Sequence, residues 1–158
     1  MFLIRGYSLI ELIIVIALIA VLAAASMSFL GPGQQRYGRD ARRQADLQSI
    51  ASAVELYRTD NGTYPPGSSW ASLTTILTGT GYLRNVPTDV TTGRQYAYTS
   101  YYFGGAGAGP TPCVAPNRCP GFALCAALER NTTPIPASYP VCGSCGGAVS
   151  CSFRVTNP

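Results

Sequence analysis

The chain contains no lysine and no histidine, and all eleven of its basic residues are arginine. Histidine and lysine are the commonest general bases, and a serine or cysteine nucleophile usually needs such a base beside it. Aspartate and glutamate are then the conventional acid–base groups that remain. The sequence therefore predicts that the protein is not an enzyme, and we expect no bound cofactor.

Carboxylates are scarce as well, because the chain has seven acidic residues and Glu129 is the only one between Val90 and Pro158. A hard cation such as calcium needs several oxygen ligands, usually with carboxylates among them. The second half of the chain therefore argues against a calcium loop, and we predict no metal site there.

With 158 residues, the chain has room for one small folded domain beyond its N-terminal segment. The net charge is only +4, and much of it sits in one cluster: Arg36, Arg39, Arg42 and Arg43. Asp40 and Asp46 each follow one of these arginines by four residues, a spacing that permits weak ion pairs on a solvated helix surface. Contact with anionic lipid or nucleic acid is the alternative, but four arginines are fewer than a nucleic-acid-binding stripe needs.

The longest uncharged stretch runs from Leu12 to Leu30, directly after Glu11. As a helix rising about 1.5 Å per residue it would match the hydrocarbon core of a bilayer, so it predicts a membrane span. An ionisable group in such a span costs roughly 2.5–3.5 kcal/mol and usually marks a function or a partner. Secretory signals place small residues after the apolar region, whereas Gly6 precedes it here, so cleavage after Gly6 would keep the span.

These residues carry a family resemblance. The run Gly6-Tyr7-Ser8-Leu9-Ile10-Glu11, followed by the apolar stretch, resembles the prepilin signal of type IV pilins and type II secretion pseudopilins. The resemblance implies that a prepilin peptidase cuts after Gly6 and methylates Tyr7, and that Glu11 pairs with the N-terminal amine of a neighbouring subunit. The chain departs from the family in having Tyr7 where phenylalanine is usual, and a leader, MFLIRG, with a single arginine. An uncleaved signal anchor that tethers an unrelated exported domain is the competing interpretation.

A second helix is expected from Arg36 to Asp60, after a kink or melted turn at Gly31–Gly33. Its apolar residues recur at helical spacing on one face: Leu47, Ile50, Ala51, Val54 and Tyr57. A weaker second stripe contains Ala45, Ala53 and Leu56, and it fits either contact with other subunits or a plain solvated face. The segment Asp46–Pro66, which ends in DNGTYPP, again resembles pilins and major pseudopilins, in which such a helix runs into a DNGxYP turn.

The rest of the chain predicts a short helix and three strands. Trp70, Leu73, Ile76 and Leu77 follow a serine N-cap at helical spacing. Alternating apolar residues predict strands at 96–103, 122–128 and 149–155. The first strand is rich in tyrosine, and its outward side is a candidate adhesive surface. We expect an α+β fold in which the long helix packs on an antiparallel sheet of about three strands.

All six cysteines lie in the last third of the chain: Cys113, Cys119, Cys125, Cys142, Cys145 and Cys151. An even number in a small exported domain predicts three disulfides, although six cysteines allow fifteen pairings and the sequence does not choose among them. A zinc site that uses Cys142-x-x-Cys145 and two other cysteines is the competing interpretation.

The predicted organisation has four parts: a leader at 1–6, a membrane and filament-core helix at 7–30, an amphipathic half-helix at 31–62 and a head at 63–158. The resemblance implies a structural subunit of a type IV pilus, or a pseudopilin of type II secretion or competence. The lack of carboxylates for a calcium loop, typical of major pseudopilins, favours the pilus. A monomeric membrane-tethered binding module is an alternative of another class.

The resemblance also implies the partners and the location. The expected partners are copies of the chain and other pilins in a helical filament, the prepilin peptidase, the membrane platform protein of the assembly machinery, and the membrane itself before assembly. The precursor would cross the cytoplasmic membrane once with its N-terminus inside, and the assembled subunit would lie in an extracellular filament. Nucleic acid is a further partner that nothing else in the sequence supports.

Overall fold

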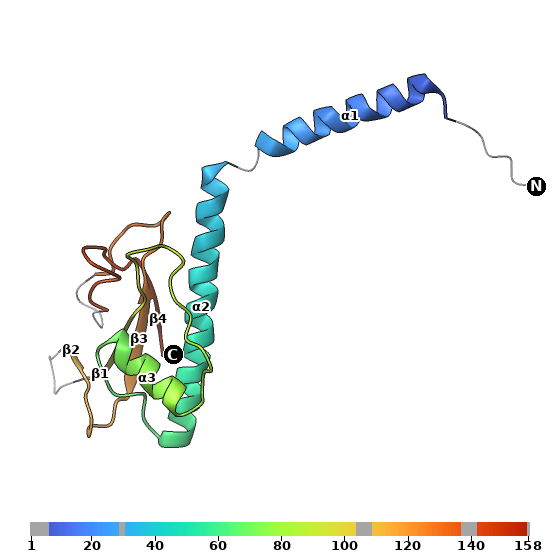
Figure 1. Cartoon of the computed structure of the whole chain (residues 1–158). Coiled ribbons are helices and arrows are strands. Elements are labelled where there is room, and N and C mark those ends of the chain that lie inside the picture. Colours follow the sequence, from blue (N-terminus) through green and yellow to red (C-terminus); the bar gives the residue numbers. More distant parts are fainter. Residues whose placement is uncertain (1–6, 29–30, 104–108, 137–141, 158) are drawn as a thin grey trace, which may run out of the picture. The chain divides into compact units, whose positions relative to one another are not determined.

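The structure is a computed structural model that describes residues 7–28, 31–103, 109–136 and 142–157. The chain divides into two compact units, Met1–Gly38 and Arg39–Pro158, and each is treated by itself below. The elements, labelled in Figure 1, are α1 (Leu9–Ser28), α2 (Pro32–Asn61), α3 (Trp70–Gly79), β1 (Ala97–Phe103), β2 (Pro110–Pro112), β3 (Gly121–Ala126) and β4 (Phe153–Thr156). The predicted leader, 1–6, lies outside the described residues.

Two helices, α1 and α2, make up the N-terminal helical region, and the break between them lies next to Gly31–Gly33, where the sequence predicts a kink or a melted turn. Helix α1 ends at Ser28 and α2 begins at Pro32. Proline is favoured at the first position of a helix because its missing N–H has no intrahelical partner there, and it cannot continue a preceding helix. Gly33, in contrast, lies inside α2, where the Gly31 carbonyl accepts a hydrogen bond from the Gln34 N–H at 3.0 Å.

The apolar stripe predicted on α2 forms one wall of the core of the second unit. Leu47, Ile50 and Val54 are fully buried in a cluster that also contains Phe122 and Leu124 of β3. Burial of a side chain of this size contributes about 1.5–3 kcal/mol, so this stripe fixes which side of α2 faces the sheet. The second predicted stripe does not stay together, because Ala53 is buried with the first while Ala45 and Leu56 remain exposed.

The sheet is antiparallel throughout, and its strand order is β2-β1-β3-β4. It has four strands where the sequence predicts about three. Strands β1 and β3 match the predicted segments closely. Strand β2 was missed because two of its three residues are proline, which lacks the N–H of a ladder and is tolerated only at an edge. The expected strand at 149–155 is wrong in its first half, since β4 begins only at Phe153.

Both faces of the inner strand β3 are covered, and every one of its residues is buried. Phe122 and Leu124 point into the cluster shared with α2 and α3. Ala123 and Cys125, on the opposite face, belong to a second cluster that includes Cys142, Cys145 and Cys151. The cysteine-rich segments therefore form a third layer of the head, and the sequence predicted only the layer made by the helix.

Helix α3 begins where a serine N-cap was predicted. The Ser69 hydroxyl accepts a hydrogen bond from the Ser72 N–H at 3.1 Å, which satisfies one of the free donors of the first turn. Leu73 and Leu77 are buried in the core, and Trp70 packs edge-on against Tyr96 with ring centroids 5.5 Å apart.

The six cysteines form three disulfides, as predicted: Cys113–Cys119, Cys125–Cys142 and Cys145–Cys151. This pairing was open at the level of sequence. Cys142 and Cys145 bond to different partners, so the competing zinc site is not formed. The Cys145–Cys151 bridge closes a short loop, and Ser150 inside the loop forms an isolated β-bridge with Ser144 just before it, so no regular strand begins at Val149.

Candidate assembly site

In the first unit, Tyr7 lies just before α1 and Glu11 lies in the first turn of this helix. The Ser8 carbonyl accepts hydrogen bonds from the N–H groups of Glu11 and Leu12 at 3.0 and 3.2 Å, so the helix is established from its first turn. Glu11 lies in that turn, where the partial positive charge of the free N–H groups favours a carboxylate. Gly6, the residue expected to precede the cleaved bond, lies outside the described residues.

Tyr7 and Glu11 lie on one side of the helix. Together with Leu12 and Val15 they line a shallow hollow of about 200 Å³. The Tyr7 side chain is 86% exposed. The hollow therefore combines an apolar wall with one carboxylate, and the backbone nitrogen of Tyr7 is close to Glu11 along the chain.

The rest of α1 is an apolar surface without cover. Its large side chains are each at least 46% exposed: Leu9, Ile10, Leu12, Ile13, Ile14, Val15, Ile16, Leu18, Ile19, Val21, Leu22 and Met27. The segment Leu9–Met27 is long and apolar enough to cross a membrane, and none of it is buried. Glu11 is the single charged residue between Tyr7 and Ser28. A helix apolar on all sides must be buried in lipid or in a bundle of other helices.

A second feature, in the head, is a fully buried arginine. The Arg43 guanidinium donates two hydrogen bonds to the Asp89 carboxylate, at 2.7 and 2.9 Å. Its third nitrogen reaches Asp40 at 2.8 Å and Glu129 at 3.0 Å. The Asp40 carboxylate also accepts hydrogen bonds from the N–H groups of Glu129 and Arg130. The arginine thus ties α2 to the segment before β1 and to the segment after β3.

Glu129 is held from two sides in this cluster. Arg39 donates to both of its carboxylate oxygens, at 2.7 and 2.6 Å, while Arg43 bonds one of them. These hydrogen bonds, first those from Arg39, lower the pKa of Glu129 to about 2. Burial would raise the pKa of Asp89, but its hydrogen bonds with Arg43 and the Thr91 N–H outweigh burial and lower it. The pKa of Arg43 is raised, chiefly by the hydrogen bonds to Asp89.

The prediction of a solvated arginine surface is therefore wrong for half of the arginine cluster. Arg36 and Arg42 are exposed, but Arg43 has no exposed area and Arg39 pairs with Glu129. Asp40 pairs with Arg43, and Asp46 accepts a hydrogen bond from the Tyr96 hydroxyl at 2.7 Å. The i,i+4 spacing pointed to the wrong partners because local spacing does not report long-range contacts. In the sequence, the one sign of these long-range contacts was Glu129, a lone carboxylate in a stretch with no other acidic residue.

The ion pairs that Arg39 and Arg43 form with the nearby carboxylates are structural, and they do not form a metal site. Among the residues that the structure describes, no group of three histidine, cysteine, aspartate or glutamate side chains could hold a metal ion. The carboxylates that come together around Arg43 are neutralised by guanidinium groups. In the first unit, the candidate functional group is the carboxylate of Glu11 on its apolar helix.

Comparison with known proteins bears on this N-terminal region first. Residues 1–27 match a family model described as a prokaryotic N-terminal methylation motif. The chain is also similar to type II secretion system core protein G of Pectobacterium carotovorum subsp. carotovorum, with 29% identity over 97 residues. The match covers 54% of this chain and 60% of the relative's length. No solved structure matches. The predicted resemblance to prepilin-type proteins is thereby confirmed.

Proposed function

We propose that the protein is a structural subunit of a type IV pilus filament, cut after Gly6 by a prepilin peptidase and N-methylated at Tyr7. The methylation motif at 1–27 and the similarity to a secretion core protein support a pilin-like structural subunit. The precursor is anchored by α1 in the cytoplasmic membrane, and the assembled subunit lies in an extracellular filament. Its other partners would be the peptidase, the membrane platform protein and further pilins.

One observation carries the proposal: a single carboxylate, Glu11, stands on a fully exposed apolar helix that has no other charge. In a low-dielectric environment such a carboxylate stays ionised only with a cation beside it. Cleavage after Gly6 would create an amine at Tyr7, and the amine of one copy can pair with Glu11 of the next.

The energetics of assembly are consistent with this pairing. Lipid tails are as apolar as the side chains of α1, so moving the helix from the bilayer into a helix bundle changes little hydrophobic burial. Packing and the Glu11–amine pair then favour the bundle. Each contact uses different surfaces of the two copies, and contacts that do not close into a ring produce an open helical filament.

The test is to express the full chain with a pilus assembly machinery and to shear filaments from the cells. We expect a chain that begins at methylated Tyr7 by mass spectrometry. Glu11→Gln should leave export and cleavage intact but remove the chain from filaments, whereas Glu11→Asp, which keeps the charge, should retain part of the incorporation. Normal incorporation of the Glu11→Gln chain would refute the assigned role.

A pseudopilin of a type II secretion or competence system is the second candidate, and the similarity to a type II secretion core protein favours it. The contacts of Glu129 favour the pilus. A calcium loop, typical of major pseudopilins, needs carboxylate ligands. Glu129 is the one side-chain carboxylate from Val90 to Pro158, and it already pairs with two arginines. Abundant surface filaments made of this chain would support the pilus. Loss of protein secretion or DNA uptake in a deletion strain that keeps its surface pili would support the pseudopilin.

A monomeric membrane-tethered binding module is the remaining candidate. It requires α1 to stay uncleaved in the bilayer, and it assigns no role to Glu11. Recovery of the chain only from membranes, unmethylated and beginning at Met1, would favour it over both filament proposals.

A further inference from the structure

The first turns of α2 in the head are held by different contacts from the turns that follow. Between Arg39 and Asp46 the buried residues are Asp40 and Arg43, and both are charged. Further along the helix the buried residues are apolar: Leu47, Ile50, Ala51, Ala53 and Val54. Helix α2 therefore docks through charged groups where it enters the head, and through the apolar core in its middle.

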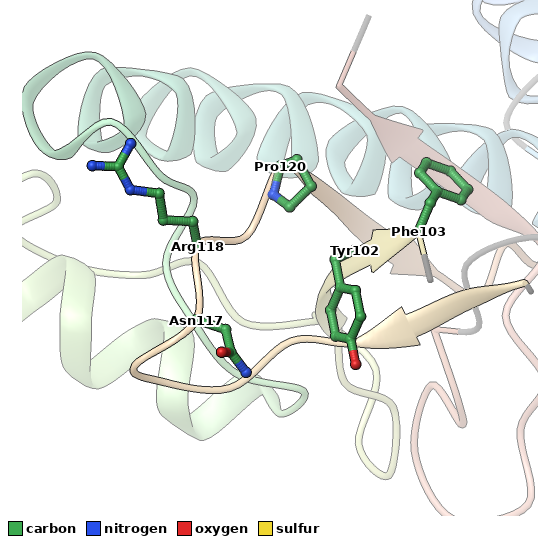
Figure 2. Close-up of a pocket in the computed structure, with 5 residues that line it drawn as sticks. All are labelled: Tyr102, Phe103, Asn117, Arg118 and Pro120. Atoms are coloured by element: carbon green, nitrogen blue, oxygen red, sulfur yellow. The ribbon is translucent and has the colours of Figure 1, made fainter. Parts of the chain in front are cut away.

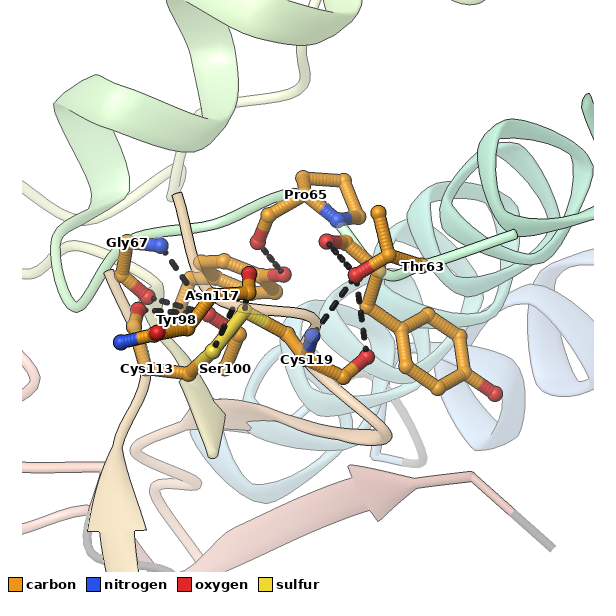
Figure 3. The surroundings of a disulfide bond; sticks show 9 residues. Thr63, Pro65, Gly67, Tyr98, Ser100, Cys113, Asn117 and Cys119 are labelled. Carbon is orange, nitrogen blue, oxygen red and sulfur yellow. Dashed lines mark hydrogen bonds between the residues drawn. A yellow bond between two sulfur atoms is a disulfide. The ribbon is translucent and has the colours of Figure 1, made fainter. Parts of the chain in front are cut away.

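The C-terminal end of α2 is fixed in a third way. The loop before β3, seen in Figure 2, is closed by the Cys113–Cys119 disulfide. Figure 3 shows how this loop binds the turn after α2: the Cys119 N–H donates a hydrogen bond to the Thr63 hydroxyl at 2.7 Å, and the Gly67 N–H donates to the Cys113 carbonyl at 2.9 Å. The Tyr64 N–H also donates to the Cys119 carbonyl at 3.0 Å. Backbone hydrogen bonds and a covalent bond thus tie this end of α2 to the sheet.

The partners of the charged turns of α2 lie on two loops. Asp89 precedes β1 and Glu129 follows β3, and neither residue belongs to a helix or a strand. The Asp40 carboxylate accepts hydrogen bonds from the N–H groups of Glu129 and Arg130, at 2.9 and 3.1 Å. If both loops moved away from α2, these contacts and the ion pairs of Arg43 with the loops would break. The hydrogen bonds within the helix and within the sheet would stay intact.

Such an opening returns the charged groups to water. Burial removes the hydration of each charge, and this loss offsets much of the attraction between the partners, so a buried ion pair adds little net stability. Exposure of apolar side chains such as Leu47 is unfavourable and is not offset in this way. The charged contacts can therefore open while the apolar core stays closed.

We propose that the head contains a latch that opens separately from its core. The latch consists of five charged residues: Arg39, Asp40, Arg43, Asp89 and Glu129. In the closed form the two loops hold the first turns of α2, and in the open form the core alone holds the helix. The chain enters the second unit at Arg39, so the latch sets how much of α2 the head holds at that point. This behaviour does not depend on filament assembly.

The test is hydrogen exchange measured by NMR on the full chain in detergent micelles, at neutral pH and low urea concentrations. The N–H groups of Glu129 and Arg130 report the latch because both donate to Asp40, and those of the inner strand β3 report the core. Opening of the latch exposes little apolar surface, so urea should hardly accelerate exchange of the two latch N–H groups. Exchange in β3 should accelerate steeply with urea.

Val54→Ala separates the latch from the core. Val54 is fully buried in the core, so its truncation destabilises the closed and the open form equally relative to the unfolded chain. It should accelerate exchange in β3 at least tenfold, and that of Glu129 and Arg130 less than twofold. If this variant does not fold, Ile50→Val, which deletes a single methyl group, takes its place with an expected acceleration in β3 of about threefold.

Arg39→Gln removes one cation of the latch, and should accelerate exchange of Glu129 and Arg130 at least fivefold. Arg118→Gln is the matched control at the fixed end of α2. Figure 2 shows Arg118 directed away from the two aromatic rings at the end of β1. Arg118 is exposed and forms no ion pair with a described residue. Its substitution should change the exchange of Glu129 and Arg130 less than twofold.

Four results would overturn the proposal. Equal acceleration of the latch and β3 N–H groups by Val54→Ala, or by urea, would show that the latch opens only when the whole head unfolds. Equal effects of Arg39→Gln and Arg118→Gln would show that the ion pairs do not hold it closed. Unprotected exchange of Glu129 and Arg130 in the parent chain would show that the latch is not closed in solution. Unchanged near-ultraviolet circular dichroism of each variant verifies that the head is folded.

Discussion

Two charged residues of this protein, Arg43 in the head and Glu11 on α1, differ in whether the described residues provide a partner of opposite charge. Arg43 in the head is fully buried and is met by the carboxylates of Asp40, Asp89 and Glu129. Glu11 lies on an apolar helix whose other residues from Tyr7 to Ser28 carry no charge. A charge whose partners come from its own chain stabilises the fold, whereas Glu11, which has no ion-pair partner among the described residues, is open to a partner from another molecule. Because a charge in apolar surroundings needs a partner of opposite charge, Arg43 is a structural residue and Glu11 is a candidate for assembly.

The largest expected effect concerns the stability of the head, and it tests the structural role of Arg43. Arg43→Ala should lower the free energy of unfolding by about 3–5 kcal/mol, because it leaves buried carboxylates without their cation. The fluorescence of Trp70, the single tryptophan, reports unfolding of the head during urea titration of the full chain in detergent. Arg42→Ala, at the exposed neighbouring position, should change the free energy by no more than about 0.5 kcal/mol. Equal effects of the two substitutions would show that the buried network does not hold the head together.

A smaller effect concerns pH. The pKa of Glu129 is lowered in the folded state to about 2 from an ordinary 4.5, and that of Asp89 is lowered too. A depressed carboxyl pKa stabilises the fold fully above the unfolded value, and this stability is lost as the pH falls through the folded value. The head should therefore lose stability between about pH 4.5 and pH 2.

Glu129→Gln sharpens this prediction. The amide does not titrate, so the variant should lose less stability across the same pH interval than the parent chain. At neutral pH it should be destabilised less than Arg43→Ala, since Arg43 keeps Asp40 and Asp89. If the free energy of unfolding changed with pH in the same way in parent and variant, protonation of Glu129 would not be the cause of the acid destabilisation.

The smallest expected effect is at Leu56, on the outer side of α2. Its side chain is 52% exposed, so Leu56→Ala should change the free energy of unfolding by no more than about 0.5 kcal/mol. The filament yield of this variant then decides between the two interpretations of the second stripe. A reduced yield identifies a contact with a neighbouring subunit, and an unchanged yield identifies a solvated face. A loss above about 1 kcal/mol would mean that Leu56 packs within its own head.

Local patterns predicted the elements that rest on local rules. Helical spacing identified the buried side of α2, the Ser69 cap placed the start of α3, and alternation located β1 and β3. Strand β2 was missed because Pro110 and Pro112 contradict strand propensity, and an edge position makes them tolerable. The start of β4 was predicted too early, because the alternation from Val149 continues through a loop that the Cys145–Cys151 bridge closes.

The amino-acid sequence by itself sets the spacing of Gly6, Tyr7 and Glu11 along the chain, and residues so close in sequence need no tertiary contact to stay together. The same holds for the length and apolarity of α1. Tertiary structure alone decided the disulfide pairing and the partners of Arg43. The contacts of Arg43 with Asp89 and Glu129 join residues far apart in the chain, and their geometry exists only once the sheet brings the segments together.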